Sequence, residues 1–307
     1  MKNLILVNPI SGRGFAEKAI PKIEALLQSH KLDYELVKTE KPWDAAEIAE
    51  SASRRGVDVI AVASGDGTIN EAINGLMQAR KAGFNHTAMS ILPVGTGNDA
   101  AYGLGFPPDL EAAVAALARG TRHRVDVGLV RGGDFPEGRY FINGVGVGFD
   151  AAVGFVAVKI RWVRGLPAYL IAALETIFLY FKPPVVELKL DHAELTQPAL
   201  MVSIMNGRRL GGGFYTAPAG DPTDGQLDVC IASVSGRMRI LTLLPYFMKG
   251  TQATQPEIRM ERTGKITVRA IQGILPAHCD GETLCHEGRE LTVELIPQAL
   301  EFILHRE

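Results

Sequence analysis

Three glycine-rich segments in the first third of the chain have residue types that could hold phosphate groups. They are Asn-Pro-Ile-Ser-Gly-Arg-Gly at residues 8–14, Ser-Gly-Asp-Gly-Thr at residues 64–68, and Pro-Val-Gly-Thr-Gly-Asn-Asp at residues 93–99. Each follows a predicted strand and precedes a predicted helix, where backbone amides can bind an anion. One such turn is weak evidence, because strand-to-helix turns need glycine for steric reasons. Three turns at the carboxyl ends of parallel strands indicate one ligand crevice.

Acidic side chains inside two of these turns indicate that a cation accompanies the phosphate. Asp66 and Asp99 would repel phosphate unless a divalent cation stood between them, so the pattern favours magnesium-bridged ATP. The same carboxylates could instead cap helices or close Asx-turns, which is a purely structural use. No turn has the Walker pattern GxxxxGK[ST] or a lysine placed to clamp phosphates, and this excludes a P-loop fold.

A second acidic pair lies far along the chain, in Asp280-Gly281-Glu282. Asp-Gly is the strongest short hairpin signal, so the residues alone favour a hairpin tip. A positioned carboxylate could also accept the proton of a hydroxyl during phosphoryl transfer, in which alignment and charge neutralisation do most of the catalytic work. No His or Cys stands in a nucleophile arrangement, and the pattern therefore favours direct in-line attack over a covalent phosphoenzyme.

The elements that must position these residues change character along the chain. Short β-branched runs alternate with helical patterns in the first third, at residues 4–7, 57–62 and 89–92. This alternation predicts a doubly wound α/β unit with a parallel sheet. From Arg124 onward, short runs with Gly and Pro punctuation predict a β-rich, sandwich-like unit. We expect domains at residues 1–124 and 125–307, with the active site in their cleft and the last few residues returning to the first domain.

The second part contains several predicted strands and one apolar helix. The strands are expected at residues 125–130, 140–144, 185–190, 200–205, 227–232, 266–270 and 291–295. The helix is expected over residues 166–181, where one face carries Leu166, Leu170, Ala173, Leu174, Ile177 and Phe181. Such a face is ordinarily packed in a core. Because Arg161, Arg164 and Lys182 bracket the helix, it could equally rest on an anionic membrane surface.

Composition excludes several classes of protein. The chain has 307 residues, 47% of them hydrophobic and 21% charged, as in a globular protein with a substantial core. The formal net charge of -2 does not suggest a nucleic-acid partner. Three cysteines without CxxC spacing disfavour disulfides and zinc. The apolar run at residues 4–7 is too short for a signal peptide, and residues 166–181 are too short for a membrane span, so a cytoplasmic location is expected.

The motifs, taken in order, resemble the diacylglycerol kinase catalytic-domain family. They are Asn-Pro-x-Ser-Gly-x-Gly, x-Gly-Asp-Gly-Thr-x-Asn-Glu, Pro-x-Gly-Thr-Gly-Asn-Asp, the run Phe-Ile-Asn-Gly-Val-Gly-Val-Gly-Phe-Asp at residues 141–150, and Asp-Gly-Glu. The resemblance spans nearly the whole chain and is greater to compact bacterial soluble lipid kinases than to sphingosine and ceramide kinases. One departure is Ser64, which stands where the family has the first glycine of Gly-Gly-Asp-Gly-Thr.

The resemblance implies roles for individual residues. It implies ATP contacts by Asn8, Pro9, Ile10, Ser11, Gly12, Thr39, Ser64, Gly65, Asp66, Gly67, Thr68, Ile69, Asn70, Gly95, Thr96 and Asn98. It places Asp66 in the metal-phosphate network, and Asp280 and Glu282 at the transfer centre, without deciding which of the two is the base. It also implies a Mg2+ loop formed by Asp221, Asp224 and Gln226, whose alternative is a solvated acidic turn.

These features together predict an ATP-dependent lipid kinase, with diacylglycerol first among its substrates. The alternatives are a kinase of another lipid, such as a sphingoid base or ceramide, a kinase of a soluble metabolite resembling NAD kinases, and a non-catalytic nucleotide- or lipid-binding regulator. The expected partner is a lipid substrate met by peripheral contact at the inner membrane face. A homodimer is implied by the resemblance alone.

Overall fold

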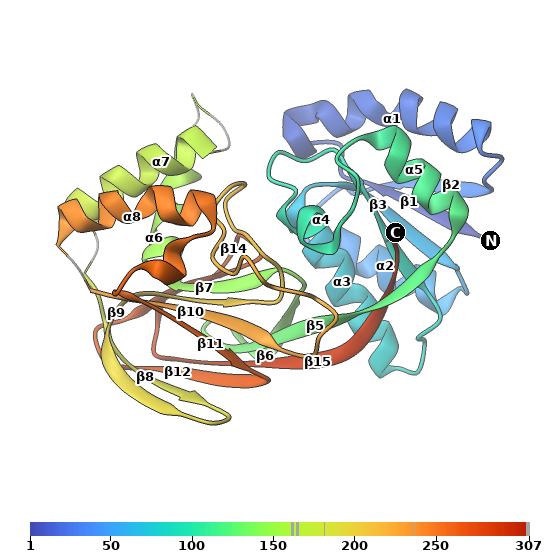
Figure 1. Cartoon of the computed structure of the whole chain (residues 1–307). Coiled ribbons are helices and arrows are strands. Elements are labelled where there is room, and N and C mark those ends of the chain that lie inside the picture. The colour runs from blue at the N-terminus through green and yellow to red at the C-terminus, as the bar shows by residue number, and fades with distance from the viewer. Residues whose placement is uncertain (161–162, 164–165, 181, 235, 305–307) are drawn as a thin grey trace. The chain divides into compact units, whose positions relative to one another are not determined.

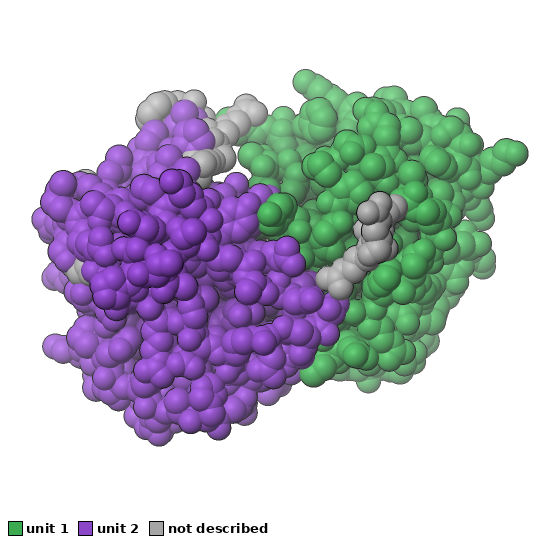
Figure 2. Space-filling view, in the orientation of Figure 1, with its two compact units in different colours: residues 1–126, 297–307 green, residues 127–296 purple. Residues whose placement is uncertain are grey.

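The computed structural model describes residues 1–160, 163, 166–180, 182–234 and 236–304. The chain forms two compact units, which Figure 2 shows in green and purple. Unit 1 contains residues 1–126 and the segment from Pro297 onward, and unit 2 contains residues 127–296. Two long strands, β5 (Arg122–Gly132) and β15 (Glu290–Ile303), have residues in both units.

Unit 1 is built on a parallel sheet in the order β2–β1–β3–β4, with the end of β15 pairing in parallel with β4 (Figure 1). The strands are β1 (Asn3–Val7), β2 (Tyr34–Lys38), β3 (Val59–Ser64) and β4 (Ala88–Pro93). The helices are α1 (Ser11–Ser29), α2 (Asp44–Arg54), α3 (Asp66–Lys81), α4 (Asp99–Leu104) and α5 (Leu110–Arg119). The α/β prediction for this part of the chain is confirmed.

Helices cover both faces of this sheet because its strands are apolar on both sides. Every residue of β1 and β3 is buried. Alternate side chains such as Ile5 and Val59 pack against α1 and α5. Helix α3 packs closely on α2, since a Cβ added at Gly75 would clash with the backbone of Ala46. The carboxyl ends of the parallel strands are thereby held at one edge, where the three glycine-rich turns follow them.

Unit 2 is a sandwich of two mainly antiparallel sheets that share the long strand β9 (Glu194–Met205). One sheet has the order β14–β13–β7–β9–β10–β11, and the other continues from β9 through β8, β12, β15, β5 and β6. The strands not yet given are β6 (Phe135–Phe141), β7 (Gly144–Gly148), β8 (Val185–Leu190), β10 (Leu227–Ser233), β11 (Ile258–Thr263), β12 (Lys265–Gln272), β13 (Leu275–Cys279) and β14 (Glu282–Gly288). Buried side chains from both sheets, including Val202 and Val268, form its core, which confirms the predicted sandwich.

Three helices gather on one side of unit 2 (Figure 1). They are α6 (Phe149–Ala157), α7 (Leu166–Glu175), continued by a π-helical turn at Thr176–Tyr180, and α8 (Arg237–Lys249). A short 3-10 helix, Gln252–Thr254, follows α8. The predicted apolar helix is thus present, whereas α6 and α8 were not predicted. Among the described residues, no helix combines the length and apolarity needed to cross a membrane.

The predicted apolar face of the helix at 166–181 is divided between core and solvent. Ala173 and Ile177 are buried in a cluster with residues of α6 and α8. Leu174 of this face is 44% exposed, and so is Phe178, which was not part of the predicted face. Arg161, Arg164 and Phe181 lie outside the described residues, as does the side chain of Leu166.

The strand predicted over residues 140–144 was wrong. Strand β6 ends at Phe141 and β7 begins at Gly144, so two strands meet where one was expected. The chain bends at Ile142 and Asn143 because their backbone N–H groups turn to the carboxylate of Asp280.

Candidate functional site

The first glycine-rich turn leaves β1 in a conformation that only a glycine-rich segment adopts easily. Gly12, Arg13 and Gly14 all have positive φ angles of 57°, 57° and 85°. A Cβ at Gly12 would lie 2.7 Å from the carbonyl oxygen of Val94, in the third turn. The first and third turns are therefore in direct contact through a position that has no room for a side chain.

Thr68 ties the first and second turns together. Its Oγ1 accepts a hydrogen bond from Nδ2 of Asn8 at 2.9 Å and another from Oγ of Ser64 at 2.8 Å. Ser64 thus contributes a hydroxyl that fixes the hydroxyl of Thr68. The turn leads into α3, whose first residue is Asp66, so the N-terminal end of this helix lies in the same place.

The third turn packs against the second through a close contact between Gly95 and Gly65. A Cβ added at Gly95 would clash with the backbone of Gly65, and one added at Gly65 would lie 3.5 Å from Oγ of Ser11. Asn98, with φ of 51°, donates from Nδ2 to the carbonyl of Gly95 at 3.2 Å. Its buried Oδ1 has no hydrogen-bond partner among the described residues. The three turns thus pack together into one backbone cradle, which contains one unpartnered hydrogen-bond acceptor, Oδ1 of Asn98.

Two carboxylates lie around Gly97 in this cradle. A Cβ at Gly97 would be 3.0 Å from Oδ2 of Asp66 and 3.9 Å from Oδ2 of Asp99. The other oxygen of Asp66 accepts the N–H of Ala100 at 3.0 Å, at the start of α4. Carboxylate oxygens are ligands that Mg2+ prefers, and it commonly takes one or two of them together with substrate phosphates. The chemistry of these residues fits a magnesium-bound nucleotide.

The predicted nucleotide residues differ in how accessible they are. Pro9, Gly65 and Gly67 are partly exposed, and Ile10 and Thr96 are exposed. Thr39 is buried at the end of β2, where its N–H donates to the carbonyl of Val7 at 2.9 Å. Ile69 and Asn70 have fully buried side chains inside α3. The side chains of Ile69 and Asn70 therefore pack inside unit 1 behind the turn, where they are not accessible to solvent.

In unit 2, Asp280 and Gly281 form the predicted hairpin tip. Cys279 of β13 pairs with Glu282 of β14, and the two residues between them have positive φ angles of 48° and 84°. This is the combination that a two-residue type I′ turn requires. The hairpin prediction is confirmed, and the turn carries both predicted acidic residues.

The two carboxylates of this turn have different environments. Asp280 is buried, and its Oδ1 accepts the N–H groups of Asn143 at 3.0 Å and Gly144 at 2.9 Å, while Oδ2 accepts that of Ile142 at 3.0 Å. Glu282 is exposed and its carboxylate has no hydrogen bond or ion pair with the described residues. Asp280 therefore shapes the bend between β6 and β7, and Glu282 is the carboxylate available to solvent.

A group of polar side chains next to this hairpin was missed by sequence reasoning. Oγ of Ser203 donates to Oδ2 of Asp150 at 2.9 Å, and burial raises the pKa of Asp150 to about 7. Burial also lowers the pKa of His278 to about 4. A Cβ at Gly146 would clash with both Nε2 of His278 and Oδ2 of Asp150, so the two groups lie beside the same glycine. Their spacing along the chain carries no signal, because the sandwich fold alone brings them together.

In the predicted magnesium loop, the carboxylates of Asp221 and Asp224 already have hydrogen-bond or ion-pair partners within the protein. Oδ1 of Asp221 accepts the N–H of Thr223 at 3.0 Å and its hydroxyl at 2.6 Å. Asp224 accepts the N–H of Gln226 at 3.0 Å and forms an ion pair with Arg262. Within the described part of the chain, no group of three or more His, Cys, Asp or Glu side chains is arranged as a metal site. The loop does not need a cation to balance Asp224, and a metal there stays a prediction.

Two family models match the chain and together cover most of it. The model of the diacylglycerol kinase catalytic domain matches residues 2–130, and that of the YegS C-terminal NAD kinase beta sandwich-like domain matches residues 143–304. A diacylglycerol kinase of Mycobacterium tuberculosis is 30% identical over 303 residues, covering 98% of this chain and 94% of that protein. A diacylglycerol kinase of Bacillus subtilis is 28% identical, covering 91% and 88%.

Solved structures with the same fold include two kinases. A diacylglycerol kinase from Bacillus anthracis has a TM-score of 0.73 at 22% identity, covering 99% of this chain and 97% of that one. An NAD kinase from Archaeoglobus fulgidus in complex with ATP has a TM-score of 0.54 at 15% identity, covering 99% and 94%. At these identities the likeness shows the fold alone.

Proposed function

We propose that this chain, which belongs to the diacylglycerol kinase catalytic-domain family, transfers the γ-phosphate of ATP to the hydroxyl of diacylglycerol and so forms phosphatidic acid. The observation that carries the proposal is the contact of three glycine-rich turns in unit 1, at Gly12 with Val94 and at Gly65 with Gly95. These contacts make a backbone cradle of the kind that binds phosphates.

The proposed nucleotide site uses the N-terminal end of α3 and the surrounding turns. Backbone amides in residues 64–68 would donate to phosphate oxygens, and the unpartnered Oδ1 of Asn98 would accept a hydrogen bond from the nucleotide. Asp66 and Asp99 would hold Mg2+. The metal ion neutralises charge on the phosphates when it is bound.

In the proposed transfer, the lipid hydroxyl attacks the γ-phosphorus in line. The bond from that phosphorus to the bridging oxygen breaks, ADP leaves, and the hydroxyl proton passes to a carboxylate. We assign the proton acceptor to Glu282, because the oxygens of Asp280 already accept three backbone N–H groups. Asp280 would then hold the turn that presents Glu282.

The lipid acceptor has to be taken from a membrane surface, and we propose that α7 and the turn after it make this contact. Leu174 and Phe178 lie one helical turn apart and are each 44% exposed, although other side chains of the same helix are buried. The free energy of the system falls when half-exposed apolar side chains enter the lipid interface.

The homodimer implied by the resemblance is a further prediction, which light scattering in solution checks.

The acceptor is identified by transfer of labelled γ-phosphate from ATP and Mg2+ to a panel of acceptors. The panel should contain diacylglycerol, a sphingoid base and ceramide in mixed micelles, with NAD as a soluble acceptor. Labelled phosphatidic acid formed faster than any other product supports the proposal. Label on NAD and none on lipids would replace it with a soluble-metabolite kinase, and ATP binding without any transfer would replace it with a regulator.

A further inference from the structure

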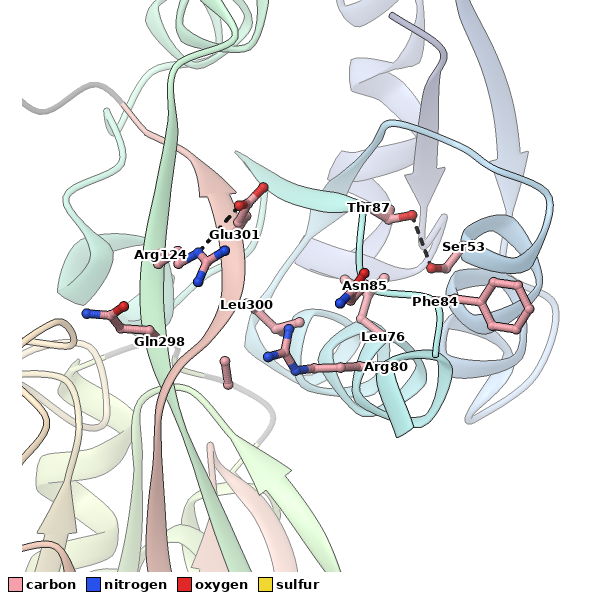
Figure 3. A pocket seen from close by; sticks show the side chains of 11 residues that line it. Ser53, Leu76, Arg80, Phe84, Asn85, Thr87, Arg124, Gln298, Leu300 and Glu301 are labelled. Atoms are coloured by element: carbon pink, nitrogen blue, oxygen red, sulfur yellow. Dashed lines mark hydrogen bonds and ion pairs between the residues drawn. The ribbon is translucent and has the colours of Figure 1, made fainter. Parts of the chain in front are cut away.

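Unit 1 has a hollow lined by residues of α3, β5 and β15 (Figure 3). Its volume is about 290 Å³, and its polar lining includes Arg80, Asn85, Thr87, Arg124, Gln298 and Glu301. Thr87 stands directly before the amino end of β4, whereas the third glycine-rich turn follows the carboxyl end of the same strand. The hollow therefore lies at the opposite edge of the parallel sheet from the nucleotide turns.

Two guanidinium groups approach this hollow from opposite sides. Figure 3 shows Arg80 reaching in from the last turn of α3 and Arg124 from β5. The guanidinium of Arg80 is exposed and has no hydrogen bond or ion pair with the described residues. Nε of Arg124 is 3.6 Å from Oε1 of Glu301, and its side chain is 63% exposed.

The one carboxylate among the lining residues does not neutralise these cations. Oε2 of Glu301 accepts a hydrogen bond from Nη1 of Arg122 at 2.9 Å, a closer contact than the one with Arg124. Glu301 is thus shared between two guanidinium groups, and Arg80 adds a third positive charge. The hollow has a net positive charge and side-chain amides of Asn85 and Gln298 as neutral donors.

We propose that this hollow is a second binding site, for a small phosphomonoester, separate from the nucleotide site. Guanidinium groups match the geometry of phosphate oxygens and bind them in pairs of hydrogen bonds. The volume is at the small end of ligand sites, so the phosphate carries a compact substituent. Carbonyl groups at the C-terminal end of α3 disfavour an anion, and the two arginines therefore supply the attraction. This site is independent of the proposed kinase reaction.

Isothermal titration with glycerol 3-phosphate tests the site, with glycerol as the uncharged match. The full chain is first saturated with Mg2+ and a non-hydrolysable ATP analogue, so that the nucleotide turns are occupied. The variants are Arg80→Ala and Arg124→Ala, and the control is Arg55→Ala, an exposed arginine of unit 1 paired with Glu35 at 3.4 Å. Each pocket variant should weaken binding at least tenfold, since each removes charge-assisted hydrogen bonds, while the control binds as the native chain does.

The same phosphate chemistry could come from a soluble ester or from a lipid headgroup. A flotation assay with vesicles of phosphatidic acid in phosphatidylcholine separates these sources. Binding to vesicles that falls in both pocket variants assigns the site to the headgroup, and unchanged vesicle binding together with weakened glycerol 3-phosphate binding assigns it to a soluble ester. If neither probe binds, or if both bind equally to the native chain and to the two pocket variants, the site does not exist.

Discussion

At the scale of single residues, the hydroxyl of Thr68 links the first glycine-rich turn to the second. Its hydroxyl accepts hydrogen bonds from Asn8 and Ser64, and both Ser64 and Thr68 are buried. In Thr68→Val these two donors lose their acceptor, which costs about 1–3 kcal/mol. We expect KM for ATP to rise about tenfold in Thr68→Val and to stay near the native value in Thr68→Ser. A native KM in the valine variant would show that this hydroxyl does not organise the turn.

Asp150 and His278 make opposite contributions to stability as the pH changes. The pKa of Asp150 is about 7 when folded and about 3.8 when unfolded, so between these values the unfolded chain loses a proton that the folded chain keeps, and stability falls as the pH rises. The pKa of His278 is about 4 when folded and about 6.5 when unfolded, so below 6.5 the unfolded chain gains a proton and stability falls as the pH drops. In the native chain the two trends oppose each other between pH 4 and 6.5.

Replacing either Asp150 or His278 should reveal the pH dependence of stability that the other residue contributes. Between pH 4 and 6.5, Asp150→Asn should become more stable with rising pH, by roughly 1 kcal/mol per pH unit, and His278→Gln should become less stable by a similar amount. The measurement is urea unfolding of both variants and the native chain across this range. Equal pH profiles for all three proteins would contradict the burial of these groups.

At the scale of elements, the tight packing of α3 on α2 depends on Gly75. A methyl group there would meet the backbone of Ala46, which cannot move aside as a side chain can. We expect Gly75→Ala to destabilise the chain by about 1–3 kcal/mol. The control is Gly154→Ala in α6, where an added Cβ meets nothing within 4 Å and should be neutral or stabilising. Thermal unfolding of the two variants compares them, and equal melting temperatures would argue against the tight contact.

The exposed side chains of α7 and the turn after it give the membrane proposal its test. The double variant Leu174→Gln with Phe178→Gln should bind vesicles of phosphatidylglycerol and phosphatidylcholine about thirtyfold less tightly, because about 1 kcal/mol is lost for each of the two side chains. Ile271→Gln, at a site that is 55% exposed on β12, is the matched control. Sedimentation with vesicles measures both, and equal loss in the two proteins would mean that no specific face is used.

Local patterns predicted some elements and not others. The β-branched runs before each glycine turn predicted β1, β3 and β4, and Asp-Gly predicted the hairpin tip at Asp280. Helix α8 was missed although Ile240, Leu243 and Phe247 are spaced along one helical face, and this helix has Pro245 in its interior. Residues 140–144 looked like one strand because the bend there is caused by Asp280, which is remote in sequence.

At the scale of the whole molecule, the sequence predicted two kinds of architecture, and the order of motifs indicated one family. It could not show that the carboxylate of Asp280 accepts three backbone N–H groups, or that Asp150 and His278 lie beside the same glycine, since both facts depend on strand register. The hollow with Arg80 and Arg124 was equally hidden, because its lining comes from the beginning and the end of the chain. These three features depend on contacts between residues that are far apart in the sequence, which local patterns do not reveal.

The most direct test of the kinase account compares the native chain with Glu282→Gln and Asp280→Asn in transfer of labelled γ-phosphate from ATP to diacylglycerol. The account predicts that Glu282→Gln binds ATP normally and loses at least a hundredfold in kcat, since removal of a general base typically costs that much. Asp280→Asn should lose activity together with stability, because the neutral amide disturbs the acceptor of three N–H groups. Native rates of phosphatidic acid formation in Glu282→Gln would contradict the assigned transfer centre.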